Sequence, residues 1–461
     1  MINRNHIEKF EEIVTKENVR SDKAHLIAYC YDATKTRFEP DAVVFPRDEY
    51  DVSQILAYCN THKIIVVPRG AGSGFTGGAL PASGGIILSL ERHMNKLLEI
   101  DMQNMVAVVQ PGLINMQLQK AVEEVGLFYP PDPASEEYST LGGNVSENAG
   151  GMRAAKYGIT KDYVMALKAV LPNGEIIRAG KKTIKDVAGY NIAGILTASE
   201  GTLAVITEIT LKLIPKPKHK QTYMGIFPDV TSAMNAVFKS LASGANPVAM
   251  EFLDALVIKA LREKLNVDLP EDAGAVLVGD VDGNLTDEVD FQLKTLEESF
   301  KENGATKFVI AKDDAHAKEL WYARKNASPS ITIFGNKKLN EDISVPRSKL
   351  PEALEAIYKV GKKYNLQVPC FGHAGDGNIH VNVMVKDKDD KMQMTQGHYA
   401  IEEIFQLVVD MGGTLSGEHG IGTAKAPYMS IAFNDAEMAL FKSIKKAFDP
   451  NNILNPFKMG L

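Results

Sequence analysis

The sequence has few cysteines, a single tryptophan and no long hydrophobic run. Its cysteines, Cys30, Cys59 and Cys370, are too few and too widely separated for a disulfide framework or a thiolate metal site. We therefore expect three buried thiols in a reducing compartment. No apolar run approaches the roughly 18 residues needed to span a bilayer. The polar N-terminal segment also lacks the apolar core of a signal peptide. These absences favour a cytoplasmic protein without a membrane span.

An excess of positive charge is also absent. The chain has 51 Lys and Arg residues against 58 Asp and Glu residues, for a net charge of −7. This balance argues against a broad nucleic-acid-binding surface. Hydrophobic residues make up 45% and charged residues 24% of the chain, which is ordinary for a soluble globular protein. A length of 461 residues corresponds to two or three domains.

The first half of the chain alternates between strand and helix patterns. Residues 52, 55, 56 and 59 are apolar at helical spacing and predict an amphipathic helix. Asn173-Gly174 predicts a hairpin turn, and the Pro/Lys cluster at 215–218 predicts a domain boundary. Apolar strands are expected at 42–45, 64–67, 85–90 and 105–109.

In the second half the order of strand and helix patterns changes, which predicts an α+β cap domain with an antiparallel sheet. From Asp435 onward the pattern indicates one helix and then an Asn/Pro-rich tail. Strands are expected at 274–280, 307–310 and 379–385, and helices near 287–303, 316–324 and 348–364.

A glycine run at 68–78, PRGAGSGFTGG, contains the G-x-G-x-x-G pattern of dinucleotide-binding proteins. A Rossmann loop opens a helix, but here Pro81, Gly84 and Gly85 precede another strand. The Rossmann interpretation therefore fails, and a nicotinamide-dependent dehydrogenase is disfavoured. Consecutive backbone N–H groups in such a loop can still bind a diphosphate. Taken alone, the segment is also compatible with a mobile surface turn.

Two further clusters strengthen the hypothesis of a bound cofactor. Residues 141–152 interleave glycines with short hydrogen-bonding side chains, which lets the backbone approach a flat polar ring closely. The turn at Glu200-Gly201 enters a β-branched strand and can present backbone amides to a heterocycle.

Five segments in this order resemble the FAD-linked D-2-hydroxy acid dehydrogenases, which are flavoproteins of the vanillyl-alcohol-oxidase (PCMH) type. Within this family the chain most resembles D-lactate dehydrogenases, the FAD subunit of glycolate oxidase and D-2-hydroxyglutarate dehydrogenases. The resemblance covers the chain from about residue 41 to the end. The segments are PRGAGSGFTGG, LGGNVSENAGG, KDVAGYNIAGILTASEGTLAVITE, CFGHAGDGNIHVNV and SGEHGIGTAKAPYM.

The resemblance implies an α+β fold in four segments. These are an N-terminal helical segment (1–37), a two-subdomain FAD-binding domain (38–217), a substrate or cap domain with the metal site (218–425), and a C-terminal helix and tail that return to FAD (426–461). FAD would be bound non-covalently, because neither His62 nor His93 occupies the place of the covalent histidine of some relatives. Ala204 and Phe457 stand where the family usually has glycine. The implied FAD-binding residues are Pro68, Gly70, Ala71, Gly72, Ser73, Gly74, Thr76, Gly77, Asp132, Gly142, Gly143, Asn144, Ser146, Asn148, Gly151, Tyr157, Gly158, Glu200, Gly201, Ile206 and Asn455.

A second constellation comprises His373, His380, Glu418 and His419, all on glycine-flanked segments or a strand. Two imidazoles and one carboxylate can fill three positions of a catalytic metal site and leave others open. Zinc is the leading candidate for the metal, with iron(II) and manganese as alternatives. The alternative to a metal site is that these histidines are simply part of the core. The family resemblance assigns His373, His380 and Glu418 as ligands and His419 as the base.

The chemistry of a 2-hydroxy acid is consistent with this set. A metal chelated by the hydroxyl and one carboxylate oxygen lowers the pKa of the hydroxyl. His419, with an ordinary pKa of about 6.5, can accept that proton. The resemblance gives Arg324 as the substrate-carboxylate partner, with Ser328 and Asn382 as further contacts. Asn340 replaces a lysine of some relatives, which favours D-lactate or glycolate over a substrate with a second carboxylate.

Electrons must leave the flavin for another carrier, because the chain has no thiolate iron–sulfur site. An electron-transfer flavoprotein, an iron–sulfur subunit or a quinone-linked protein is the expected partner. Two alternatives remain: a flavin subunit that serves assembly or electron passage only, and an oxidase that uses O₂. The oligomeric state is left open, with a homodimer as one option.

Overall fold

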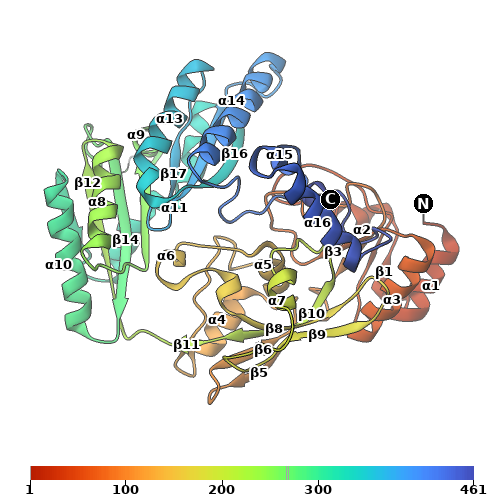
Figure 1. Ribbon diagram of the computed structural model, residues 1–461. Coiled ribbons are helices and arrows are strands. Elements are labelled where there is room, and N and C mark those ends of the chain that lie inside the picture. The colour runs from red at the N-terminus through yellow and green to blue at the C-terminus, as the bar shows by residue number, and fades with distance from the viewer. Residues whose placement is uncertain (1, 266, 268) are drawn as a thin grey trace. The chain divides into compact units, whose positions relative to one another are not determined.

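The structure is a computed structural model that describes residues 2–265, 267 and 269–461. It divides into two compact units (Figure 1). Unit 1 comprises the chain up to Gly151 together with Ile159–Lys216 and Glu418–Leu461, and unit 2 comprises Met152–Gly158 and Pro217–Gly417. Both units combine helices with strands, which confirms the predicted α+β class.

Unit 1 contains two main sheets with separate hydrophobic cores. In the first, β2, β4 and β3 are parallel, and β1 adds an antiparallel edge. The second sheet is antiparallel throughout, and its β8–β9 hairpin confirms the Asn-Gly turn. The first sheet has the order β1 (Val19–Arg20), β2 (Ala42–Val44), β4 (Ile86–Ser89), β3 (Val66–Arg69). The second has the order β5 (Leu97–Asp101), β6 (Val106–Val109), β10 (Val205–Lys212), β8 (Val164–Val170), β9 (Ile176–Gly180).

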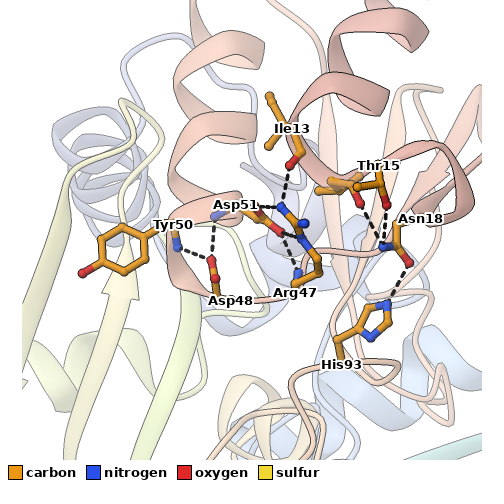
Figure 2. Close-up of polar contacts among 9 residues, drawn as sticks. Ile13, Thr15, Asn18, Arg47, Asp48, Tyr50, Asp51 and His93 are labelled. Carbon is orange, nitrogen blue, oxygen red and sulfur yellow. Dashed lines mark hydrogen bonds and ion pairs between the residues drawn. The ribbon is translucent and has the colours of Figure 1, made fainter.

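An arginine contacts both the N-terminal helix α1 (Arg4–Val14) and helix α3 (Glu49–His62) (Figure 2). Arg47 donates from Nη2 to the carbonyl of Ile13 at 2.8 Å and from Nε to buried Asp51 at 2.7 Å. Nearby, Nε2 of His93 lies 2.8 Å from Oδ1 of Asn18. His93 is thus engaged with the N-terminal segment.

Unit 2 is built on one antiparallel sheet of seven strands, as the sequence predicted. His373, which follows Gly372 in a glycine-rich segment, is the last residue of β17, because that strand pairs on both sides and keeps the backbone extended. The sheet has the order β15 (Lys307–Ile310), β12 (His219–Phe227), β14 (Ala275–Gly283), β13 (Ala249–Asp254), β17 (Cys370–His373), β18 (Asn378–Val385), β16 (Lys337–Ser344). Its longer helices are α8 (Val230–Ala242), α9 (Ala255–Leu265), α10 (Thr286–Glu302), α11 (Asp314–Lys325), α13 (Leu350–Lys363) and α14 (Lys391–Asp410).

A buried carboxyl at the start of α9 should give unit 2 a pH-dependent stability. Asp254 accepts hydrogen bonds from the backbone N–H groups of Val257 (2.8 Å) and Cys370 (2.7 Å) and from the hydroxyl of Tyr358 (3.1 Å). Burial nevertheless raises its pKa to about 6. A carboxyl whose pKa is higher in the folded state contributes stability that is complete below its unfolded pKa of about 3.9 and is lost as the pH rises through about 6.

As the pH rises from 4 to 7, we expect the titration of Asp254 to lower the free energy of unfolding by about 2–3 kcal/mol. Asp254→Asn should remove that part of the pH dependence, even if it lowers stability at every pH. Urea unfolding of both proteins across this range measures the effect, with the exposed Asp272→Asn as the control. Identical pH profiles for wild type and Asp254→Asn would contradict the prediction.

Candidate cofactor and substrate site

Unit 1 contains a pocket formed by the glycine run after β3, by helix α5 (Leu141–Glu147) and by the turn before β10. Glu418 and His419 also line it. The ring of His419 lies 5.1 Å from that of Phe75, and the hydroxyl of Thr76 donates to the His419 carbonyl at 3.4 Å. The predicted cofactor residues that line the pocket are Pro68, Gly70, Ala71, Gly72, Ser73, Gly74, Gly142, Gly143, Asn144, Ser146, Glu200, Gly201 and Ile206.

Two glycines show why the pocket wall is backbone rather than side chain. A Cβ atom at Gly70 would collide with Oγ1 of Thr140, the residue that caps α5. Gly72 has φ +69°, and a Cβ atom there would run into the guanidinium of Arg69. The loop can therefore approach α5 closely, which exposes its backbone amides to a ligand.

The pocket also contains buried polar atoms that have no hydrogen-bond partner within the described part of the chain. These are Oγ of Ser139, Nδ2 of Asn144 and Oε2 of Glu147. Burial first, and then the nearby carboxylates of Glu200 and Asp32, raise the pKa of Glu147 well above its usual range. Unsatisfied buried polar groups are costly, so a ligand with both donors and acceptors fits this wall. A flavin ring has that character.

Other predicted cofactor residues lie outside the pocket lining, and their roles stay predictions. Tyr157 belongs to unit 2, where its hydroxyl donates to Asp282 at 2.8 Å. Asn148 ends α5 in the left-handed conformation and accepts from the N–H of Lys161. Asn455 is buried in unit 1 and donates to the carbonyls of Gly78 and Glu200. The full set outside the lining is Thr76, Gly77, Asp132, Asn148, Gly151, Tyr157, Gly158 and Asn455.

Unit 2 contains a second constellation, centred on a carboxylate that no sequence motif indicated. Glu251 on β13 is paired in register with His373 on β17. Its Oε1 atom lies 2.7 Å from Nδ1 of His373, and its Oε2 atom accepts from Nε and Nη2 of Arg324 at 2.8 Å. The Glu251 side chain is fully buried. Glu251 thus orients both the predicted metal ligand and the predicted substrate arginine.

His380 and Asn382 lie on the neighbouring strand β18 and are both buried. The ring of His380 lies 5.2 Å from that of His373 and 5.3 Å from that of Phe371. Asn382 donates from Nδ2 to the carbonyls of Pro369 and His380, both at 3.1 Å. Its Oδ1 atom has no hydrogen-bond partner among the described residues. A buried acceptor of this kind suits a ligand hydroxyl.

The predicted metal ligands belong to different units. His373 and His380 lie on the paired strands β17 and β18 of unit 2, and Glu418 begins the last segment of unit 1. With Nδ1 of His373 directed at Glu251, the atom that it offers a metal is Nε2. Glu418 follows Gly417, whose N–H donates to Asp342 at 2.8 Å. Two imidazoles and one carboxylate suit zinc, iron(II) or manganese.

A lysine that contacts Ser328, a predicted substrate residue, was also not indicated by the sequence pattern. Nζ of Lys338 donates to the hydroxyl of Ser328 at 2.7 Å. Lys338 and Asn340 lie two residues apart on β16 and therefore on the same face of the strand. The absence of a lysine at position 340 thus does not remove positive charge from this face.

Comparison with known protein families gives two matches along the chain. The family described as "FAD binding domain" matches residues 40–180. The family described as "FAD linked oxidases, C-terminal domain" matches residues 216–459.

Several relatives match over nearly the whole chain. The glycolate oxidase subunit GlcD of Bacillus subtilis is 40% identical, with 100% of this chain and 97% of the relative covered. The D-lactate dehydrogenase of Anaerostipes hadrus is 34% identical (98% and 96% covered). The D-2-hydroxyglutarate dehydrogenase of Stutzerimonas stutzeri is 31% identical (98% of each covered).

Solved structures support the same fold. Substrate-bound p-cresol methylhydroxylase is 19% identical, with a TM-score of 0.81 and coverage of 99% of this chain and 96% of that chain. At this identity the likeness shows the fold alone. Among the described residues, no helix combines the length and the apolar character that a membrane crossing requires.

Proposed function

We propose a function from the premise that this chain belongs to the FAD-linked oxidases: it oxidises a small D-2-hydroxy acid to the 2-oxo acid. D-lactate is favoured, and glycolate is second. The observation that carries the proposal is the unit 1 pocket, where a backbone-lined loop, unsatisfied polar atoms and the His419 imidazole lie together. The relatives support it, since glycolate, D-lactate and D-2-hydroxyglutarate are all 2-hydroxy acids.

In this proposal FAD is bound non-covalently in the unit 1 pocket. The backbone of residues 70–74 holds its diphosphate, and Asn144 and Glu147 hydrogen-bond the ring system. Bound FAD supplies a two-electron acceptor for a hydride from C2 of the substrate. The chain's own contribution is to fix the orientation of the ring and to exclude water from it.

We assign His373, His380 and Glu418 as ligands of one divalent cation, with zinc favoured and iron(II) or manganese as alternatives. A bound cation supplies charge that lowers the pKa of a coordinated hydroxyl. Glu251 fixes the tautomer of His373, because its carboxylate requires a proton on Nδ1.

The remaining residues bind the substrate and move its proton. His419 accepts the hydroxyl proton on its imidazole. Arg324 keeps Nε and Nη2 on Glu251 and uses its other edge for the substrate carboxylate. Asn382 offers its buried Oδ1 atom to the substrate as a hydrogen-bond acceptor. The hydroxyl of Ser328 accepts a hydrogen bond from Lys338. Because Lys338 is a second cation, D-2-hydroxyglutarate remains an alternative substrate.

Electrons then pass to a protein partner, an electron-transfer flavoprotein or an iron–sulfur subunit. All three cysteines are buried. Relatives named as glycolate oxidase subunits favour a complex, so the FAD subunit of a glycolate oxidase is the second candidate function. A cytoplasmic location and a homodimer stay predictions.

Anaerobic reduction of the purified flavoprotein tests the proposal. We expect D-lactate or glycolate to bleach the oxidised flavin band within one turnover, and L-lactate to act at least tenfold more slowly. Turnover of the isolated chain with an artificial acceptor separates an enzyme from an assembly subunit, and peroxide formation in air would indicate an oxidase. A flavin that every short D-2-hydroxy acid leaves oxidised contradicts the proposal.

A further inference from the structure

A buried carboxylate in unit 1 holds the loop that follows the proposed base. Glu200 accepts the backbone N–H of Ile421 on Oε1 and that of Gly422 on Oε2, both at 2.7 Å. The two donor residues come two and three positions after His419. Glu200 is one of the implied FAD-binding residues, and its carboxylate contacts this loop.

The backbone of Glu200 is itself held in an unusual conformation. Its φ is +50°, a left-handed value that non-glycine residues rarely adopt. Its N–H donates to the carbonyl of Ser146 at 2.9 Å, and its carbonyl accepts from Nδ2 of Asn455 at 2.7 Å. These backbone hydrogen bonds, one to the pocket wall and one to the C-terminal tail, therefore fix the direction of the carboxylate.

The loop has little freedom to move away from Glu200. The N–H groups of Thr423 and Ala424 both donate to the carbonyl of Thr76, at 2.9 and 3.0 Å. Gly420 has φ +84°, and a Cβ atom at this position would collide with Oε2 of Glu147. The two carboxylates thus lie directly against the turn that follows His419.

A lysine compensates the buried negative charge. Nζ of Lys458 donates to the carbonyls of Gly77 and Leu80, both at 2.7 Å. Burial lowers its pKa to about 8, while Glu200, Asp32 and Glu147 act in the opposite direction. At neutral pH its ammonium group balances this cluster, so Glu200 can remain an acceptor for two amides.

We infer that Glu200 is a positioning residue that acts on His419 through the backbone of Ile421 and Gly422. This inference rests on the proposed function, since it gives His419 the role of base. Glu200 needs two acceptor oxygens for this role, and a glutamine offers one. A displacement of about 1 Å in a catalytic group can lower the rate by about 10²-fold.

Glu200→Gln is the primary test, and Glu208→Gln on β10 is the matched control. In Glu200→Gln we expect amide hydrogen exchange of residues 420–424 to rise at least tenfold and kcat to fall about 10²-fold. KM should change less than threefold, because Arg324 and Asn382 are untouched. The pH profile of kcat should also shift, which a merely structural role would not produce. Glu208→Gln should leave all four quantities unchanged.

The exchange measurement needs no substrate, so it distinguishes failure of this inference from failure of the proposed function. Wild-type flavin that no hydroxy acid reduces overturns the proposed function, whereas unchanged exchange in Glu200→Gln overturns the inference. Increased exchange with unchanged kcat also overturns it. If Glu200→Gln does not fold, Gly420→Ala displaces the same turn from the side of Glu147, and the same losses are expected.

Discussion

Replacing Glu251 by alanine is expected to destabilise unit 2 by about 3–5 kcal/mol and to weaken metal binding by about 10–100-fold. The substitution leaves the guanidinium of Arg324, whose side chain is only 13% exposed, without the carboxylate that it contacts through two nitrogens. It also removes the acceptor that holds Nδ1 of His373. Urea unfolding measures the first effect, and titration of the demetallated protein with zinc measures the second.

Two companion variants separate the effects. Glu251→Gln keeps the shape of the side chain and removes its charge, so both losses should be smaller than in Glu251→Ala. In the double variant Glu251→Gln with Arg324→Met, stability should partly recover, because no unpaired buried charge remains. The exposed Glu263→Ala on α9 should change stability by less than about 0.5 kcal/mol. A metal affinity for Glu251→Ala equal to that of wild type would refute the orienting role.

His380→Ala and Glu418→Ala are each expected to lower turnover with D-lactate by about 10³-fold or more while flavin content stays near that of wild type. Each removes one of the three side chains that we propose as ligands of the cation. The estimate follows from the several kcal/mol of charge stabilisation that a catalytic cation supplies. Metal analysis and flavin absorbance of the same samples, together with steady-state turnover, test this expectation.

Matched controls exist in unit 2 for both substitutions. His398 and Glu402 lie on α14 and are exposed, so His398→Ala and Glu402→Ala should keep metal, flavin and turnover. Full activity in His380→Ala or Glu418→Ala would show that the metal assignment is wrong. Loss of flavin with the metal retained would show that Glu418 supports the pocket rather than a cation.

The sequence alone indicated those parts of the site that short local motifs identify. The glycine run at 68–78 could be separated from a Rossmann loop by the strand and Pro81 that follow it. The pair Glu418-His419 was recognisable between its glycines, and the structure places both residues in the pocket lining. The β8–β9 hairpin and most of the strands were also indicated, because apolar runs and Asn-Gly turns act over a few residues.

Local pattern could not indicate the residues that support these motifs. Glu251 lies 122 positions from His373 in the chain, and only the pairing of β13 with β17 brings the two side chains together. Glu200 belongs to a recognised motif, yet its carboxylate reaches amides 221 and 222 positions away. Thus motifs indicated the chemical groups, and the family resemblance that they carry implied the cofactor class and the α+β fold. Strand register and loop closure decided which buried charges orient those groups, because such contacts depend on distance in space and leave no periodic trace along the chain.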